Sequence, residues 1–141
     1  KYFKEQKKIA IWNTLKKPKY DLGKKVDFWL KTNKKIILYG TYDQTDFLIR
    51  NIKNFEKLNI IGFLPYRNFN DDINNTKKTK ISYKTIRSLN QNLIKESEIL
   101  ISSYEFCYDI ERELKIKYLD IKMFKYYNGY SRDLRITNKE K

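Results

Sequence analysis

The chain has 141 residues and a formal net charge of +14, with 31 Lys and Arg against 17 Asp and Glu, and it contains no His. This length suits a single domain with one hydrophobic core, and without His the chain cannot build a Ser-His or Cys-His relay. The single cysteine, Cys107, excludes an intrachain disulfide and a cysteine-based zinc site, and it fits a reducing, cytoplasmic setting. Because no apolar run reaches about eighteen residues, we expect no transmembrane segment.

Two explanations compete for the basic charge. A strongly basic chain suggests an anionic partner such as nucleic acid or a membrane surface. However, Lys, Ile, Asn and Tyr are abundant while Ala and Val occur once each, a bias typical of A/T-rich codons that scatters Lys over solvated faces. Lys also greatly outnumbers Arg, the residue favoured for bidentate recognition of phosphates and bases. We therefore favour the compositional explanation and expect no nucleic-acid partner.

The first 20 residues are expected to form a helical extension or linker. Apolar residues such as Ile11 and Leu15 recur there at helical spacing, and Pro18 ends the pattern. The chain starts with Lys rather than Met, which suggests a fragment of a longer protein with further domains. We therefore expect three parts: the extension at 1–20, a folded domain at 21–131 and a polar tail at 132–141.

Helices and strands are expected to alternate from residue 21 onward. Asp21 precedes an apolar pattern of helical period, which makes it the expected cap of the first helix. A polar, unpatterned stretch at 68–80 is the expected surface loop. The expected elements are helices at 21–33, 43–55, 84–93 and 104–114, and strands at 36–39, 60–64, 81–83, 98–102 and 118–124.

Five strands alternating with helices predict an α/β fold. The first, second and fourth strands are nearly continuous apolar runs, which indicates a parallel sheet covered on both faces. Right-handed crossovers then give the strand order 3-2-1-4-5. The predicted architecture is a Rossmann-like three-layer sandwich with an N-terminal helical extension.

The expected binding crevice lies where the strand order reverses, beyond the carboxyl ends of the first and fourth strands. Backbone N–H groups at the start of the following helices favour an anion there. Arg67 places a cation just after the end of the second strand. The candidate ligand-binding residues are Gly40, Thr41, Tyr42, Asp43, Arg67, Ser102, Ser103 and Tyr104.

The glycine loop is only partly that of a dinucleotide site. Gly40 keeps the turn, but Tyr42 and Thr45 stand where two further glycines would admit a pyrophosphate and allow close helix packing. The second strand ends in "FLPYRN", without the acidic residue that would hold a ribose hydroxyl. Arg67 could instead attract a phosphate, or remain a solvated loop cation. NAD is therefore disfavoured, and a nucleotide or nucleotide-sugar is the expected ligand.

No catalytic residue and no metal ligand is predicted. Asp43 and Glu105 lie at the mouths of the two loops, where stabilisation of a helix N-terminus is the simpler role. Cys107 lies near a helix start that could stabilise a thiolate, but the helical pattern favours a buried, inert thiol. We do not expect this chain alone to be catalytic, although it could be part of a transferase.

Four stretches carry a resemblance to a known class of domain: "KKIILYGTYDQTDFLIRNI", "NIIGFLP", "EILISSYEFCYDIERELK" and "YLDIKMF". Their layout, over about residues 26–127, resembles the Rossmann-like nucleotide- or nucleotide-sugar-binding domains of bacterial surface-polysaccharide biosynthesis proteins. Examples are the N-terminal domain of sialic-acid-type sugar acetyltransferases and accessory domains of glycosyltransferases and sugar C-methyltransferases. In such families a Gly-x-Gly loop and an acidic residue after the second strand contact the nucleotide, and here Gly40 alone matches.

The resemblance implies an accessory module that binds a nucleotide or nucleotide-sugar, with the site either retained or vestigial, while another domain performs the chemistry. Two alternatives stay open. One is a degenerate NAD-dependent sugar-nucleotide reductase or epimerase. The other is a basic nucleic-acid-binding module, for which the C-terminal "FKYYNGYSRDLR" supplies aromatic and basic residues.

Overall fold

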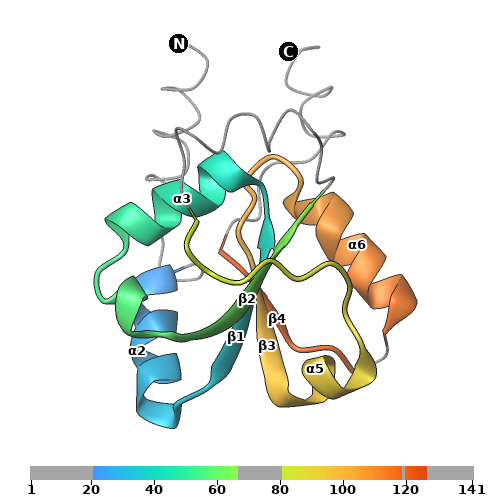
Figure 1. Cartoon of the computed structure of the whole chain (residues 1–141), viewed down its shortest axis with the longest axis horizontal. Helices are drawn as coiled ribbons and strands as arrows, with labels where there is room; N and C mark the ends of the chain where they lie inside the picture. The colour runs from blue at the N-terminus through green and yellow to red at the C-terminus, as the bar shows by residue number, and fades with distance from the viewer. Residues whose placement is uncertain (1–20, 67–80, 119, 127–141) are drawn as a thin grey trace, which may run out of the picture.

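In the described part of the chain, a four-stranded parallel sheet forms the centre of the fold (Figure 1). The structure, a computed structural model, describes residues 21–66, 81–118 and 120–126. The strands are β1 (Lys35–Gly40), β2 (Asn59–Pro65), β3 (Ser97–Ile101) and β4 (Met123–Lys125). They lie in the order β2-β1-β3-β4, and all three pairings are parallel. The predicted α/β class and parallel sheet are confirmed, whereas a fifth strand is not present in the described ranges.

Helices cover both faces of this sheet, which gives three layers (Figure 1). Helices α2 (Leu22–Thr32) and α3 (Tyr42–Asn51) lie on one face, and α6 (Cys107–Lys117) lies on the other. The 3-10 helix η2 (Phe55–Lys57) precedes β2, and the short helix α5 (Gln91–Glu96) leads into β3. None of the helices in these ranges is long and apolar enough to cross a membrane.

Helix α2 begins and ends where its sequence predicts. The side chain of Asp21 accepts a hydrogen bond from the backbone N–H of Lys24 at 3.1 Å, as expected of an N-cap. Asn33 follows the helix in the left-handed conformation, with φ 49°, which Asn tolerates better than most residues. The predicted helix at 21–33 is confirmed, and its apolar face, including Trp29, is buried.

The core lies along the two central strands. In β1, five of six residues are buried, and in β3 four of five. Successive side chains of a strand point to opposite faces, so such continuous burial requires cover on both sides. Each large apolar side chain buried in this way contributes roughly 1.5–3 kcal/mol to folding. The apolar runs therefore predict both the buried strands and the presence of covering layers on the two faces of the sheet.

The predicted strand at 81–83 is wrong, although the chain does run beside β2 a few residues later. One isolated parallel bridge joins Phe63 to Thr85. The N–H of Phe63 donates to the carbonyl of Lys84, and the N–H of Ile86 donates to the carbonyl of Phe63, both at 2.8 Å. The bridge lies on the side of β2 where the order 3-2-1-4-5 placed a strand. It does not extend into a strand.

The predicted helix at 84–93 is largely wrong, because its first residues run along the edge of β2. Helix α5 begins only at Gln91, after Asn90, whose side chain accepts from the N–H of Leu93 at 2.9 Å. An Asn at this position is a strong N-cap and sets the later start. The connection from 81 to 90 is therefore not helical.

The predicted final strand at 118–124 is shorter than expected. Tyr118 is the C-cap of α6, and Asp120 adopts a left-handed conformation with φ 58°, so the chain turns before β4 starts at Met123. The predicted helix at 43–55 ends at Asn51, and the one at 104–114 starts at Cys107. The expected extension at 1–20, the loop at 68–80, the tail at 132–141 and Arg67 lie outside the described residues.

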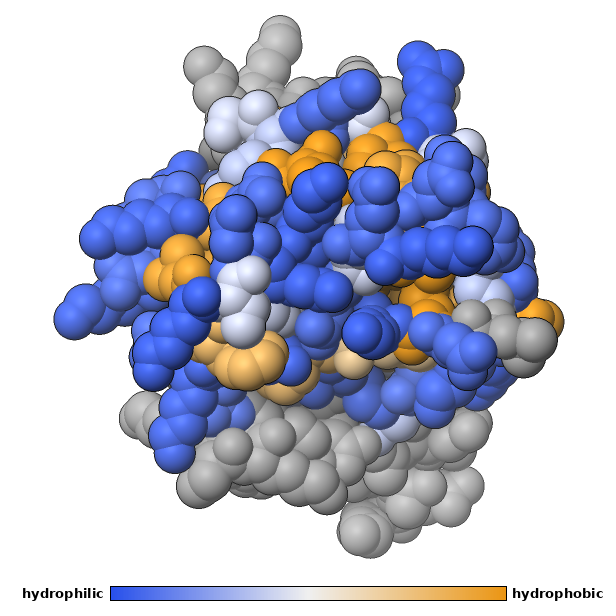
Figure 2. Space-filling view, turned by 90° about the horizontal axis from the view of Figure 1, so that it is seen from below, coloured by the Kyte–Doolittle hydropathy of each residue, from blue (hydrophilic) through white to orange (hydrophobic). Residues whose placement is uncertain are grey.

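The amino-terminal end of the sheet is mainly polar on its surface. Figure 2 shows this side of the molecule, where hydrophilic residues cover most of the surface and hydrophobic residues appear in small separate groups. The opposite end, where the strands point, carries the residues predicted to bind a ligand.

Candidate functional site

The ends of β1 and β3 meet directly. A Cβ atom added to Gly40 would lie 2.6 Å from the carbonyl carbon of Ser102 and 2.8 Å from the backbone nitrogen of Ser103. The N–H of Ser102 also donates to the carbonyl of Tyr39 at 2.9 Å. No described glycine has a positive φ. Gly40 is thus required for the close approach of two loops rather than for a turn that only glycine can make.

A threonine of α3 fills the space behind this contact. Thr45 is fully buried, and its Oγ1 lies 2.6 Å from Oγ of Ser102, within hydrogen-bond distance. In a dinucleotide site a glycine at this position would let the helix pack closely. Here the hydrogen bond between the hydroxyls of Thr45 and Ser102 joins α3 to the end of β3.

Gln44 joins α3 to the loop between β3 and α6. Its side chain is only 5% exposed. The amide oxygen Oε1 accepts hydrogen bonds from Oγ of Ser103 at 3.2 Å, from the N–H of Glu105 at 3.1 Å and from the N–H of Tyr104. Successive backbone N–H groups that converge in this way form an anion-binding concavity. In this protein the concavity holds an oxygen atom from the neighbouring helix.

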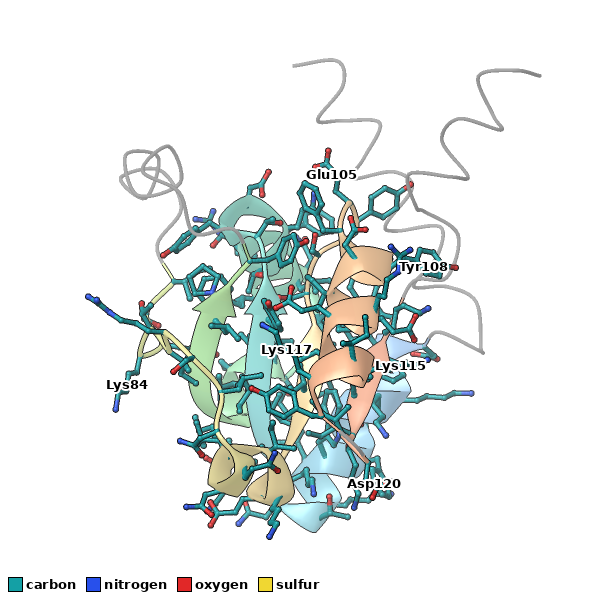
Figure 3. The ribbon with its side chains drawn as sticks, turned by 90° about the vertical axis from the view of Figure 1, so that its right-hand side faces the viewer. Lys84, Glu105, Tyr108, Lys115, Lys117 and Asp120 are labelled. Atoms are coloured by element: carbon teal, nitrogen blue, oxygen red, sulfur yellow. The ribbon has the colours of Figure 1, made fainter. Side chains whose placement is uncertain are left out.

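Ser103 links this contact to the start of α6. Its Oγ donates to Gln44 and accepts from the N–H of Phe106 at 3.0 Å. Asp43 remains local, since its carboxylate accepts from the next N–H along the chain at 2.9 Å. Figure 3 places Glu105 at this end of the molecule, above the start of α6. The structure therefore brings all the described candidate residues to the end of the sheet at which the strands finish.

Aromatic rings pack near the same strand ends. Tyr42 turns toward β2, where its ring packs edge-on against Phe63 with centroids 5.0 Å apart. On the other face Tyr66 contacts Phe106 at 5.3 Å and Tyr39 at 5.9 Å. Aromatic packing therefore contributes to both faces of the sheet near the strand ends.

Two titratable groups near the start of α6 are buried. Cys107 is 1% exposed, and this burial raises its pKa to about 12 despite the nearby Lys125. Tyr126 is fully buried, which raises the pKa of its hydroxyl well above the usual value, and Cys107 and Tyr104 add to the effect. At neutral pH the thiol is therefore protonated, as the predicted inert role requires.

Gln44 is the residue that the sequence reasoning missed. A signal was present, because Gln44 and Thr45 precede Leu48 by four and three residues and so share its inward face. Polar side chains on the buried face of a helix need partners, and the ends of neighbouring strands are the nearest supply. Which partners they find depends on the sheet order.

The site contains no metal-binding cluster: within 21–66, 81–118 and 120–126, no three His, Cys, Asp or Glu side chains converge. The described residues define an α/β protein with a parallel sheet whose order is compatible with a Rossmann-like fold. The sequence matches no protein-family model, and neither a curated protein nor a solved structure matches it significantly.

Proposed function

We propose that this chain is a non-catalytic accessory module of a larger glycoconjugate-pathway protein, in which the nucleotide crevice of a Rossmann-like fold is closed by the chain's own side chains. The observation that carries the proposal is Gln44, whose amide oxygen accepts three hydrogen bonds at the strand end where a phosphate would bind. The pathway follows from the resemblance of the sequence layout. The module positions neighbouring parts of the protein, and the chemistry is performed elsewhere.

A ligand phosphate would have to displace Gln44 from its donors. Gln44 is held next to them by α3, so it competes as an intramolecular group at a high effective concentration. Displacement would also leave the buried amide without a partner, which costs about 1–3 kcal/mol. Tight nucleotide binding at this edge therefore requires the Gln44 contact to be removed first.

Thermal denaturation with added ligands tests the proposal. For the unaltered chain we expect no concentration-dependent rise in Tm with UDP-sugars, NAD or coenzyme A, since a ligand that binds only the folded state must raise it. Gln44→Ala should free the three donors. In that variant, inorganic phosphate and UDP should raise Tm, by an amount that corresponds to about 1.4 kcal/mol at ten times the dissociation constant.

Gln91→Ala is the matched control, because Gln91 is exposed at the start of α5. It should behave as the unaltered chain with every ligand. Saturable stabilisation of the unaltered chain by a nucleotide would overturn the closed-crevice proposal. If phosphate did not raise the Tm of the Gln44→Ala variant, the donors around Gln44 would not be a former anion site.

A further inference from the structure

A cavity opens on the sheet face that α6 covers. Its volume is about 210 Å³, and Tyr39 of β1 and Leu64 of β2 are among the residues that line it. Arg87 contributes from the connection that precedes α5, and Glu113, Lys117 and Tyr118 contribute from the end of α6. The cavity is thus made by different side chains from those around Gln44.

Among the described residues, α6 is the long helix on this face, and the connection at 81–90 forms the other side of the cavity. The connection at 81–90 follows the edge of β2 instead of crossing the sheet as a helix. Figure 3 shows α6 on one side of the face and this connection, marked by Lys84, on the other, with β1 and β2 between them. Lys117 lies on the side of α6 that faces β1 in the same view.

The polar groups of the cavity carry an excess of positive charge. Glu113 Oε1 accepts from the hydroxyl of Tyr39 at 3.0 Å and pairs with Lys117 at 3.3 Å. Its second oxygen, Oε2, has no hydrogen-bond partner among the described residues. Arg87 has no ion-pair partner in the part of the chain that the structure describes. Two cations therefore face one carboxylate.

We propose that this cavity binds a monosaccharide-sized anion, a sugar ring that bears a carboxylate or a phosphate. The planar guanidinium of Arg87 suits either anionic group because it can donate two parallel hydrogen bonds. Glu113 Oε2 can accept from a ring hydroxyl, while Leu64 and the ring of Tyr118 supply apolar contact. The proposal concerns a site separate from the strand-end crevice and does not depend on whether that crevice is closed.

The volume limits the size of the ligand. Since a water molecule takes up about 30 Å³ in the liquid, the cavity holds roughly seven waters. This space matches a single substituted ring, and the rest of a nucleotide-sugar would lie outside it. The ligand class that fills the cavity by itself is a sugar acid or a sugar phosphate.

Isothermal titration of the full chain with glucuronate, glucose 6-phosphate and glucose tests this assignment. We expect at least one of the two anions to bind saturably, with an affinity at least about tenfold higher than that of neutral glucose, because a charge-assisted hydrogen bond is lost with the latter. The preferred anion identifies the group that Arg87 recognises. Amide shifts in an NMR spectrum at Leu89 and Tyr118 should follow the same binding curve.

Arg87→Gln should weaken that binding about tenfold. Arg87 is exposed, so the variant is expected to fold. The matched control is Arg112→Gln, which removes the same charge from an exposed position on α6 outside this cavity. Absence of saturable binding of both anions below about 10 mM would overturn the proposal. So would equal affinity for glucose, or an Arg87→Gln variant that binds as well as the control.

Discussion

At Gly40 a missing side chain lets two strand ends touch. We predict that Gly40→Ala lowers the free energy of unfolding by about 3 kcal/mol, because the added methyl group would meet backbone atoms of Ser102 and Ser103 that cannot move aside independently. Urea denaturation followed by Trp fluorescence measures the change. The predicted loss exceeds what a helix or strand propensity alone would produce.

Gly23→Ala is the matched control for this substitution. Gly23 lies in the first turn of α2, and its Cβ would meet only a side-chain oxygen of Asp21 at 3.2 Å. Alanine is the better helix former, but its Cβ would press on the oxygen that caps the helix, so the two effects oppose each other and the stability should change by no more than about 1 kcal/mol. If the two substitutions had similar effects, the close approach at Gly40 would not be a source of stability.

The meeting of the two strand ends was predictable from the sequence, but the side-chain contacts between them were not. Topology alone places Gly40 and Ser102 at neighbouring strand ends, and the structure brings them into contact. The inward turn of Gln44 depends on how far α3 reaches toward the next loop, which no local pattern specifies. The sequence therefore predicts which strand ends meet more readily than it predicts which side chains fill the space between them.

At the scale of elements, the connection at 81–90 contacts the edge of β2 through the bridge at Phe63 and the packing of Ile86 on Gly62. A Cβ atom at Gly62 would meet the side chain of Ile86 and would lie 3.1 Å from the carbonyl of Lys84. We predict that Gly62→Ala costs about 1–2 kcal/mol of stability, because Ile86 must shift and the bridge to Phe63 is disturbed. Hydrogen exchange at the Ile86 amide, which donates to Phe63, should become faster in this variant.

A double-mutant cycle isolates that contact. Ile86→Ala alone should also destabilise the protein, but in the double variant with Gly62→Ala the two costs should not add, since the smaller side chain leaves room for the new methyl group. A coupling energy of about 0.5–1 kcal/mol is expected from urea unfolding. Strict additivity would mean that the two side-chain positions do not compete for the same space.

This edge also explains where element prediction failed. The helix at 21–33 and the strands β1 and β3 follow from local signals: a capping Asp21, helical spacing and continuous apolar runs. The path of the connection at 81–90 depends on the edge of β2, where Gly62 leaves room for the side chain of Ile86. A pairing between segments more than twenty residues apart overrode the local helical pattern.

At the scale of the whole molecule, buried protonated groups make stability depend on alkaline pH. Burial raises the pKa of Cys107 from 9.0 to about 12, and it also raises the pKa values of Tyr39 and Tyr126 above that of an exposed tyrosine. For Tyr39 the neighbouring carboxylate of Glu113 adds to this effect. In each case the folded protein keeps a proton that the unfolded chain releases at lower pH. The stabilisation is complete below about pH 9 and is lost as the pH rises further.

The Cys107 contribution can be isolated by substitution. Between pH 9.0 and about 12 the folded thiol retains its proton while the unfolded thiol does not, so the free energy of unfolding falls by up to about 1.4 kcal/mol per pH unit for this group. Cys107→Ala should reduce the slope by that amount in urea titrations made from about pH 9 to about pH 11. Deprotonation of lysines over this range is common to both proteins and cancels in the difference.

Ser97→Ala is the control for burial without titration. The Ser97 side chain is buried, and its Oγ has no hydrogen-bond partner in the described part of the chain, so alanine there should leave the stability unchanged or slightly higher at every pH. Its pH slope should equal that of the unaltered protein. If Cys107→Ala also kept the full alkaline slope, the thiol would have the same pKa in the folded and unfolded states. Burial next to α6 would then not raise the pKa of Cys107.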